Sequence, residues 1–210
     1  MIRRALLTLG MLACATAPAA AQVLGLPVIN NGAPTGISIG AEVGFASDAY
    51  FGGGGNAVGA HASVGLGFFG VTAAISRYAP KSGDPVWAPG ASATLRLLGG
   101  PLVPFRITMQ AGASRWTVGD VQFTHVPLSI GLAATIPNPA FAIKPWIAPR
   151  IDYLHSSLTS ILNTSDVHFG ISGGIDVALL NGLSIRGAYD RTSNDGAHPS
   201  IFSLGLGFAL

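Results

Sequence analysis

The chain has 210 residues, of which 49% are hydrophobic and 10% are charged, and its formal net charge is +2. Charged residues make up about a quarter of an average soluble domain, so this chain is unusually poor in charge. It has neither a block of basic residues, which would favour nucleic-acid binding, nor an acidic tail.

The first 21 residues have the pattern of a secretory signal peptide. A basic start at Arg3 and Arg4 is followed by an apolar run and by small residues, and we expect cleavage after Ala21. The only cysteine, Cys14, lies inside this segment, so the mature chain has no thiol or disulfide chemistry. Cleavage before Cys14, as in a lipoprotein, is the alternative, and the short apolar run disfavours it. We expect residues 22–35 to form a periplasmic N-terminal segment.

The rest of the chain is apolar but has no candidate membrane helix. No stretch approaches the roughly 18 uninterrupted apolar residues that a spanning helix needs. Only helices and closed β-barrels satisfy every backbone polar group in lipid. An exported apolar chain of this kind is therefore either a transmembrane β-barrel or a secreted β-domain.

Ten segments alternate apolar and polar residues at period two, and each is close to the length that a tilted membrane strand needs. In chain order they lie at about 36–46, 57–69, 71–78, 90–98, 105–117, 125–136, 141–155, 167–179, 183–191 and 202–210. Merging the third and fourth segments with their neighbours would leave eight strands. We predict ten, within one domain over residues 36–210.

The composition of the two faces indicates which one meets lipid. Along 141–155, Ile143 and Ile147 share one face, and Lys144 and Arg150 share the other. The polar faces consist mainly of Gly, Ala, Ser and Thr with isolated charges, whereas a solvated surface is richer in charge. Aromatic residues near both ends of the apolar faces resemble interfacial girdles: Phe45, Phe68, Phe105, Phe141, Tyr153, Phe169 and Phe208. The pattern therefore favours a membrane barrel whose apolar faces point toward lipid. The alternative is a secreted jelly-roll-like domain.

The connections between these segments alternate in length. Long connections are expected at 47–56, 79–89, 118–123, 156–165 and 192–199, and short turns at Gly70, 99–103, 137–140 and 180–182. Short turns on the periplasmic side and longer loops outside are typical of outer-membrane barrels. Both ends of the barrel domain are then periplasmic.

The last eight residues carry a resemblance to a known family. Ser203-x-Gly205-x-x-Phe208-x-Leu210 resembles the β-signal of bacterial outer-membrane proteins. The mature chain as a whole is similar to small barrels of the porin-like class, although members usually end on an aromatic residue rather than on Leu210. The resemblance implies an all-β, antiparallel, up-and-down barrel in the outer membrane of a Gram-negative cell. It also implies recognition by the barrel-assembly machinery, surroundings of lipid and lipopolysaccharide, and closure of the barrel by pairing of the last strand with 36–46.

The lumen face of the predicted barrel carries charges of both signs. They are Glu42, Arg96, Arg106, Lys144, Arg150, Asp152, Asp176, Arg186 and Asp190. An unpaired buried charge costs several kcal/mol, so we expect these groups to form a paired internal network. Side chains usually fill small barrels. We therefore predict a non-enzymatic scaffold or a narrow passive pore for small solutes, without catalytic residues, metal or cofactor.

One tripeptide supports an enzymatic alternative. His155-Ser156-Ser157 is similar to the His-x-Ser motif of outer-membrane lipid A deacylases, which implies a hydrolase using His155 and Ser157. That family has a Glu shortly after the motif. The only Glu of this chain is Glu42, on the predicted lumen face, and Asp166 would be a strained substitute.

Overall fold

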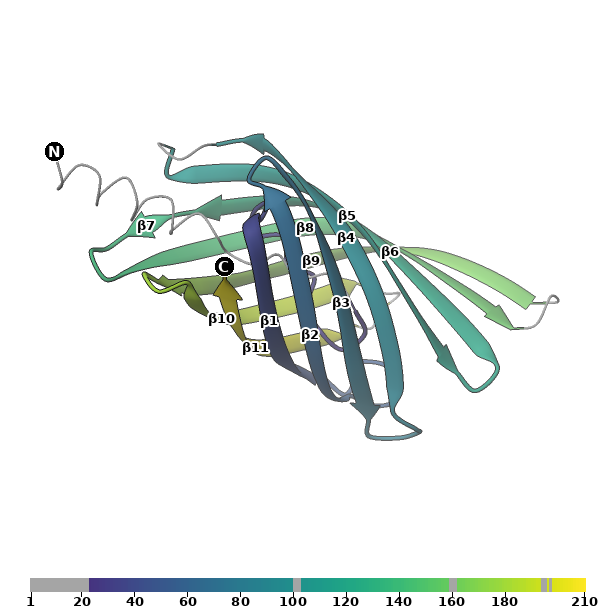
Figure 1. The fold of residues 1–210 in the computed structure, drawn as a ribbon. Helices are drawn as coiled ribbons and strands as arrows, with labels where there is room; N and C mark the ends of the chain where they lie inside the picture. The colour runs from purple at the N-terminus through teal and green to yellow at the C-terminus, as the bar shows by residue number, and fades with distance from the viewer. Residues whose placement is uncertain (1–22, 100–102, 159–161, 194–195, 197) are drawn as a thin grey trace, which may run out of the picture.

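A computed structural model describes residues 23–99, 103–158, 162–193, 196 and 198–210 of the chain. Ten long strands in it form a closed antiparallel barrel (Figure 1), and they are β1 (Thr35–Ala46), β2 (Gly55–Leu66), β3 (Phe69–Pro80), β4 (Val86–Leu98), β5 (Phe105–Val118), β6 (Val121–Ala134), β8 (Phe141–Leu158), β9 (Leu162–Leu179), β10 (Leu183–Ser193) and β11 (Ser200–Ala209). The two-residue strand β7 (Ile136–Pro137) pairs only with β8. The predicted all-β fold and the number of ten strands are confirmed.

Each long strand pairs with its neighbours in chain order, and β1 pairs with β11 to close the barrel. The closing register runs from Ser38 opposite Ala209 to Ala46 opposite Ile201. Closure leaves no sheet edge along the barrel body, as the absence of water in lipid requires. No helix within the described residues is long and apolar enough to span a membrane.

The two faces of the barrel wall differ as the alternation predicts. Large apolar side chains such as Ile39 and Leu206 stay 50% and 59% exposed on the outer wall, whereas polar residues such as Ser76 and Thr108 are buried inside. A soluble barrel has the reverse arrangement, because water would be in contact with the outer wall. This barrel therefore spans a membrane, with lipid against its apolar wall.

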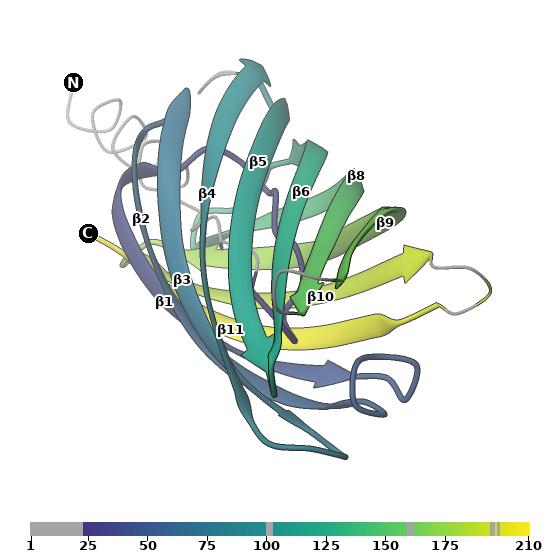
Figure 2. The ribbon, with the colours of Figure 1, turned by 90° about the vertical axis from the view of Figure 1, so that its right-hand side faces the viewer.

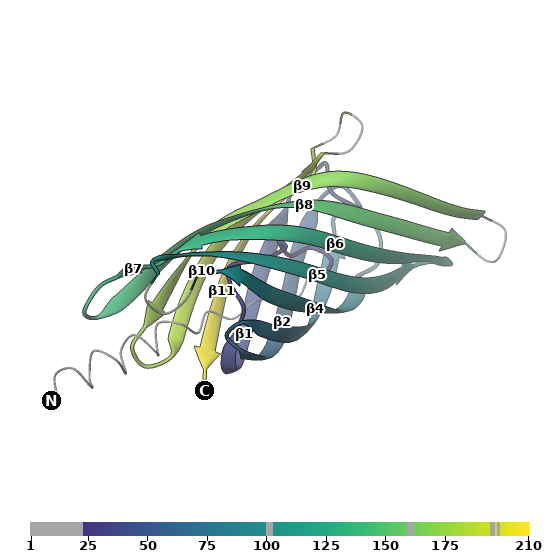
Figure 3. The ribbon, with the colours of Figure 1, turned by 90° about the horizontal axis from the view of Figure 1, so that it is seen from above.

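Four strands extend beyond the rest of the barrel at one end. β8 and β9 have 18 residues each, and β5 and β6 have 14 each. The last pair between β9 and β10 is Phe169 with Ser193, so β9 before Phe169 pairs with β8 alone. Figure 3 shows these two hairpins reaching past the neighbouring strands. We call this the hairpin end of the barrel, and the opposite end, with the turns at 67–68 and 180–182, the turn end.

The predicted long connections are correspondingly shorter in the structure. Strands β5 and β6 meet at a turn of residues 119–120, where 118–123 was the expected loop. Strands β8 and β9 likewise take up most of the expected loop at 156–165. Outside the membrane both faces of a strand can be polar, so apolar alternation fades before the strand ends.

The segment before β1 is a correction to the prediction. We expected residues 22–35 in the periplasm, but every residue from Val23 to Pro34 is buried inside the barrel (Figure 2). We call residues 23–34 the lumen segment. Its apolar side chains, among them Val23, Leu26 and Ile29, are removed from water in this position, which an extended periplasmic segment would not achieve.

Candidate functional site: the occupied lumen

The inner wall has room for the lumen segment because several inward positions are glycine. A Cβ atom added to Gly44 would lie 2.2 Å from the carbonyl oxygen of Gly25, and one added to Gly131 would lie 2.2 Å from that of Asn30. These distances are far below van der Waals contact. The lumen segment therefore lies directly against the backbone of the wall, and a single added methyl group would displace it.

The first residues of the lumen segment are held in an apolar cluster at the hairpin end. Val23, Leu24 and Leu26 pack there with wall residues including Tyr78 and Trp116. Polar groups hold the backbone in the same region, because Ser76 Oγ donates to the Leu24 carbonyl at 2.7 Å and Gly25 N donates to Tyr50 Oη at 3.3 Å. Burial raises the pKa of the Tyr50 phenol, which therefore stays protonated.

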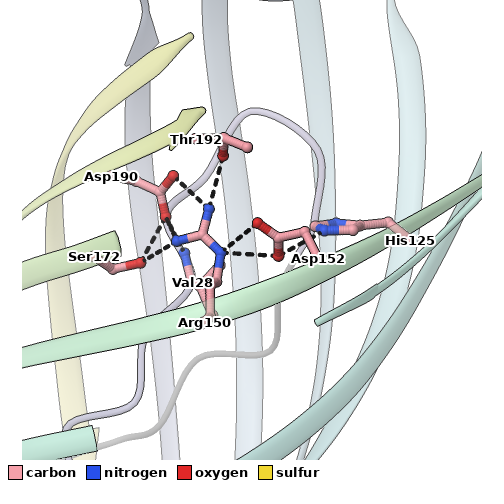
Figure 4. Close-up of polar contacts among 7 residues, drawn as sticks. All are labelled: Val28, His125, Arg150, Asp152, Ser172, Asp190 and Thr192. Atoms are coloured by element: carbon pink, nitrogen blue, oxygen red, sulfur yellow. Dashed lines mark hydrogen bonds and ion pairs between the residues drawn. The ribbon is translucent and has the colours of Figure 1, made fainter. Parts of the chain in front are cut away.

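Arg150 is the centre of one buried ion network (Figure 4). Its Nε donates to both carboxylate oxygens of Asp152, at 2.9 and 2.8 Å. Its Nη1 and Nη2 donate to Asp190 at 2.7 and 2.9 Å, and also to Ser172 Oγ and Thr192 Oγ1. Five hydrogen bonds or more saturate a guanidinium, so this cation is fully paired although it is only 3% exposed.

The same network binds the lumen segment. Val28 N donates to Asp190 Oδ2 at 3.1 Å, so the backbone of the segment shares a carboxylate with Arg150. On the other side, His125 Nε2 lies 3.0 Å from Asp152 Oδ1. The network thus joins β6, β8 and β10 to the segment that they surround.

A second network surrounds Arg186, nearer the turn end. Arg186 donates through Nη1 to Glu42 Oε1 at 3.1 Å and through Nε to Asp176. Asn31 of the lumen segment donates to the other oxygen of Asp176 at 2.8 Å. The neighbouring Asn30 accepts a hydrogen bond from Thr108. Both networks therefore hold the segment by carboxylates that are also paired with arginine.

The remaining predicted lumen charges are Lys144, Arg106 and Arg96. Lys144 is buried opposite Asp176 in the β8–β9 register. Arg106 Nη2 donates to Thr135 Oγ1 at 2.8 Å. Arg96 is half-buried beside an irregularity in the β4–β5 pairing. The structure thus brings Glu42, Arg150, Asp152, Asp176, Arg186 and Asp190 into direct pairs and leaves Arg96 and Arg106 near the turn end.

Sequence reasoning missed the residues that connect the networks to the segment. Asn30, Asn31 and His125 were not among the predicted network residues. One signal was available. Residues 23–29 contain five large apolar side chains, which is unusual for an exposed periplasmic segment. Among the described residues, no group of three or more His, Cys, Asp or Glu is placed to hold a metal ion.

Comparison with known proteins supports the fold assignment. No family model matches the chain, and no curated protein sequence does. Among solved structures, the β domain of the Bordetella autotransporter BrkA superposes with a TM-score of 0.57 at 14% identity, covering 83% of this chain and 99% of that one. The outer-membrane enzyme PagL is also similar, with a TM-score of 0.41 at 15% identity, covering 82% of this chain and 99% of that one. The Escherichia coli outer-membrane protease OmpT has a TM-score of 0.40 at 10% identity, covering 83% of this chain and 95% of that one.

The fold is that of a bacterial outer-membrane β-barrel. This agrees with the apolar outer wall and with localisation in the outer membrane. At these identities the likeness is one of fold.

The predicted β-signal of this outer-membrane barrel has residues on both faces of β11. Ser203 and Gly205 point into the lumen, and Phe208 and Leu210 lie on the outside. A Cβ atom on Gly205 would lie 2.6 Å from Glu42 Cγ. Gly205 therefore has a structural role beside Glu42, whereas recognition of the motif by the assembly machinery stays a prediction.

The predicted hydrolase residues lie on the projecting β8–β9 hairpin. His155 Nδ1 is hydrogen-bonded to Ser165 Oγ at 2.9 Å, and Ser157 lies opposite Asn163. Asp166 lies opposite Leu154, so its side chain is on the other face of the sheet from His155. The imidazole thus has a hydroxyl neighbour where a catalytic triad would have a carboxylate.

Proposed function

We propose that the protein is a non-enzymatic outer-membrane scaffold whose lumen is closed by its own residues 23–34. The complete burial of this segment is the observation that carries the proposal. A passive pore needs a continuous column of water. Here an apolar cluster occupies the hairpin end, and Asn30 and Asn31 with their partners occupy the region nearer the turn end.

The ion networks support closure rather than selectivity. A selective pore presents charges to water along its axis. The charges of Arg150 and Arg186 are instead turned toward carboxylates, and both side chains are less than a tenth exposed. They stabilise the packed interior and hold the segment through Val28 and Asn31.

Conductance in a planar lipid bilayer tests this proposal. The wild type should be silent, and a variant lacking residues 23–34 should show discrete conducting steps, because the wall alone encloses an open lumen. The Gly131→Ala variant should show intermittent conducting steps, since the added Cβ would overlap the Asn30 carbonyl and displace the lumen segment. Gly187→Ala is the matched control, because its Cβ would meet nothing closer than a Leu204 side-chain atom at 3.9 Å. A wild type that conducts as well as the deletion variant would refute closure.

A second candidate function is a lipid A deacylase-like hydrolase that uses His155 and Ser157. The hydrogen bond between His155 and Ser165 favours it, because it fixes the imidazole and leaves Nε2 free to act as a base. The location of Asp166 on the opposite face argues against it. Lipid A from cells expressing the wild type, His155→Ala or Ser157→Ala should show one and the same acylation pattern. A deacylated species that needs both residues would establish the enzyme instead.

A further inference from the structure

Two arginines are neighbours on the inner wall at the turn end, where β4 ends and β5 begins. Arg96 lies opposite Thr108 in the β4–β5 register, and Arg106 lies two residues before Thr108 on β5. Thr108 is 1% exposed, so the face that the three residues share is the inner one. Diagonal neighbours on one face of a sheet lie about 7–8 Å apart, which two arginine side chains can bridge together. The charge of Arg96 therefore acts on that of Arg106.

The surroundings of Arg106 hold its side chain in place. Arg106 Nη2 donates to Thr135 Oγ1 at 2.8 Å, just beyond the end of β6. A Cβ atom added to Gly32 of the lumen segment would lie 2.9 Å from Arg106 Nη1, and one added to Gly99 would lie 2.9 Å from Arg106 Cβ. The side chain thus passes between two glycines that leave room for it. Its guanidinium is positioned by the fold, as a binding group has to be.

An irregularity in the β4–β5 pairing determines the position of Arg96. The register shifts between Arg96 and Leu98, so β4 contains an extra residue at this point. Bulges of this kind change the direction of a side chain and recur beside functional sites. Arg96 and Arg106 are both half-buried at the same end of the lumen.

Neither arginine has a carboxylate partner. No ion pair in the part of the chain that the structure describes includes Arg96 or Arg106. Glu42 and Asp176 are already paired with Arg186. The connections at the turn end contain neither Asp nor Glu, and they are 67–68, 99–104, 135–140 and 180–182. The two cations repel each other, so an anion held between them would relieve the repulsion.

We propose that Arg96 and Arg106 bind a phosphate group at the turn end of the lumen. Arginine presents its N–H donors as a planar fork that matches the oxygens of phosphate. A carboxylate has two oxygens, which one arginine fork can fill, whereas a free phosphate has oxygens for two forks and carries more negative charge. The short connections predict that the turn end faces the periplasm. A soluble phosphate there, or the headgroup of a lipid in the adjacent leaflet, would supply the same chemistry.

The phosphate site and the closure of the lumen can fail separately. A wild type that conducts would refute closure and leave the phosphate site intact. A silent barrel that binds no phosphate would refute the site alone.

Calorimetric titration of the folded barrel with inorganic phosphate tests the inference. In micelles of an uncharged detergent at constant ionic strength, the wild type should bind phosphate at a single site. Arg96→Gln and Arg106→Gln should each weaken binding by about tenfold or more, because each removes charge-assisted hydrogen bonds. Arg115→Gln is the matched control, since Arg115 is an exposed arginine of β5 at the hairpin end, and its affinity should equal that of the wild type.

Heat-modifiable gel mobility verifies that each variant is folded. Arg96 is in neither of the two buried ion networks, so Arg96→Gln keeps the test decisive if Arg106→Gln fails to fold. Phosphate affinity that stays at the wild-type value in the folded glutamine variants overturns the inference.

A second measurement distinguishes a soluble phosphate from a lipid headgroup. The same micelles receive phosphatidylglycerol in place of inorganic phosphate, and the urea midpoint is measured, because a ligand that binds the folded state raises it. A rise in the wild type that Arg96→Gln and Arg106→Gln abolish would support the site with a lipid phosphate as its ligand. Arginine-dependent binding of inorganic phosphate alone would support it with a soluble ligand. A wild type that responds to neither phosphate overturns the inference.

Discussion

Ser203 and Leu204 are neighbours on β11, yet Ser203 is fully buried whereas Leu204 is 49% exposed. The same contrast between the inner and outer walls recurs along every long strand. The outer wall is apolar and its side chains need no partner, because lipid surrounds them. The inner wall is polar, and Arg150 and Arg186 are paired there with carboxylates that also bind the lumen segment.

This contrast shows that the polar interior, rather than an apolar core, determines how the barrel is filled. Apolar side chains on the outer wall are interchangeable in lipid as long as they remain apolar. Inside, each donor must meet an acceptor at a fixed distance, since an unpaired buried charge costs several kcal/mol. Substitutions on the two walls should therefore differ in the kind of residue that each wall tolerates.

The largest effect is expected at the inner wall, for Arg150→Met. This change leaves Asp152 and Asp190 buried without their main cation, and it should lower the free energy of unfolding by about 3–5 kcal/mol. Urea titration in lipid vesicles measures this loss of unfolding free energy. Lys81→Met is the control, because Lys81 and Asp48 form an ion pair that is 63% and 82% exposed and should contribute at most about 1 kcal/mol. Equal losses in the two variants would contradict the structural role of the Arg150 network.

A slightly smaller effect is expected at the outer wall, for Leu204→Arg. An arginine on the lipid face near mid-membrane should cost about 2–4 kcal/mol. Heat-modifiable gel mobility and urea titration would both report it. Ser203→Ala points the other way and should change stability by less than about 1 kcal/mol, because Ser203 Oγ has no hydrogen-bond partner among the described residues. If the serine variant proved the more damaging of the two, the assignment of faces on β11 would be wrong.

The smallest effect is expected at the junction between the wall and the lumen segment, for Asn31→Ala. Loss of its 2.8 Å hydrogen bond to the carboxylate of Asp176 should cost about 1.5–3 kcal/mol. Asn138→Ala is the control, since Asn138 accepts only an exposed hydrogen bond from Ala140 N and should cost less than about 0.5 kcal/mol. An unchanged urea midpoint for Asn31→Ala would show that the segment is not anchored through Asp176.

The alternation along the chain, together with the composition of its two faces, predicted the barrel. Period-two patterning is local, because successive side chains of a strand point to opposite faces. It therefore placed residues such as Leu206 and Phe208 outside and Arg150 and Asp176 inside, and it predicted ten strands. The pairing of the first strand with the last was implied by the resemblance to outer-membrane proteins. The small residues between the inward charges indicated a crowded lumen rather than a solvated surface.

What fills the lumen was decided only by the tertiary structure. Residues 23–34 have no period-two pattern, and their partners are far away in the chain: Asn31 and Asp176 are 145 residues apart, and Val28 and Asp190 are 162 apart. The pairing of each arginine with its carboxylates likewise depends on strand register and barrel closure. Local periodicity reports which face a side chain occupies, but the partner it meets across the lumen depends on how the whole sheet closes around the segment inside it.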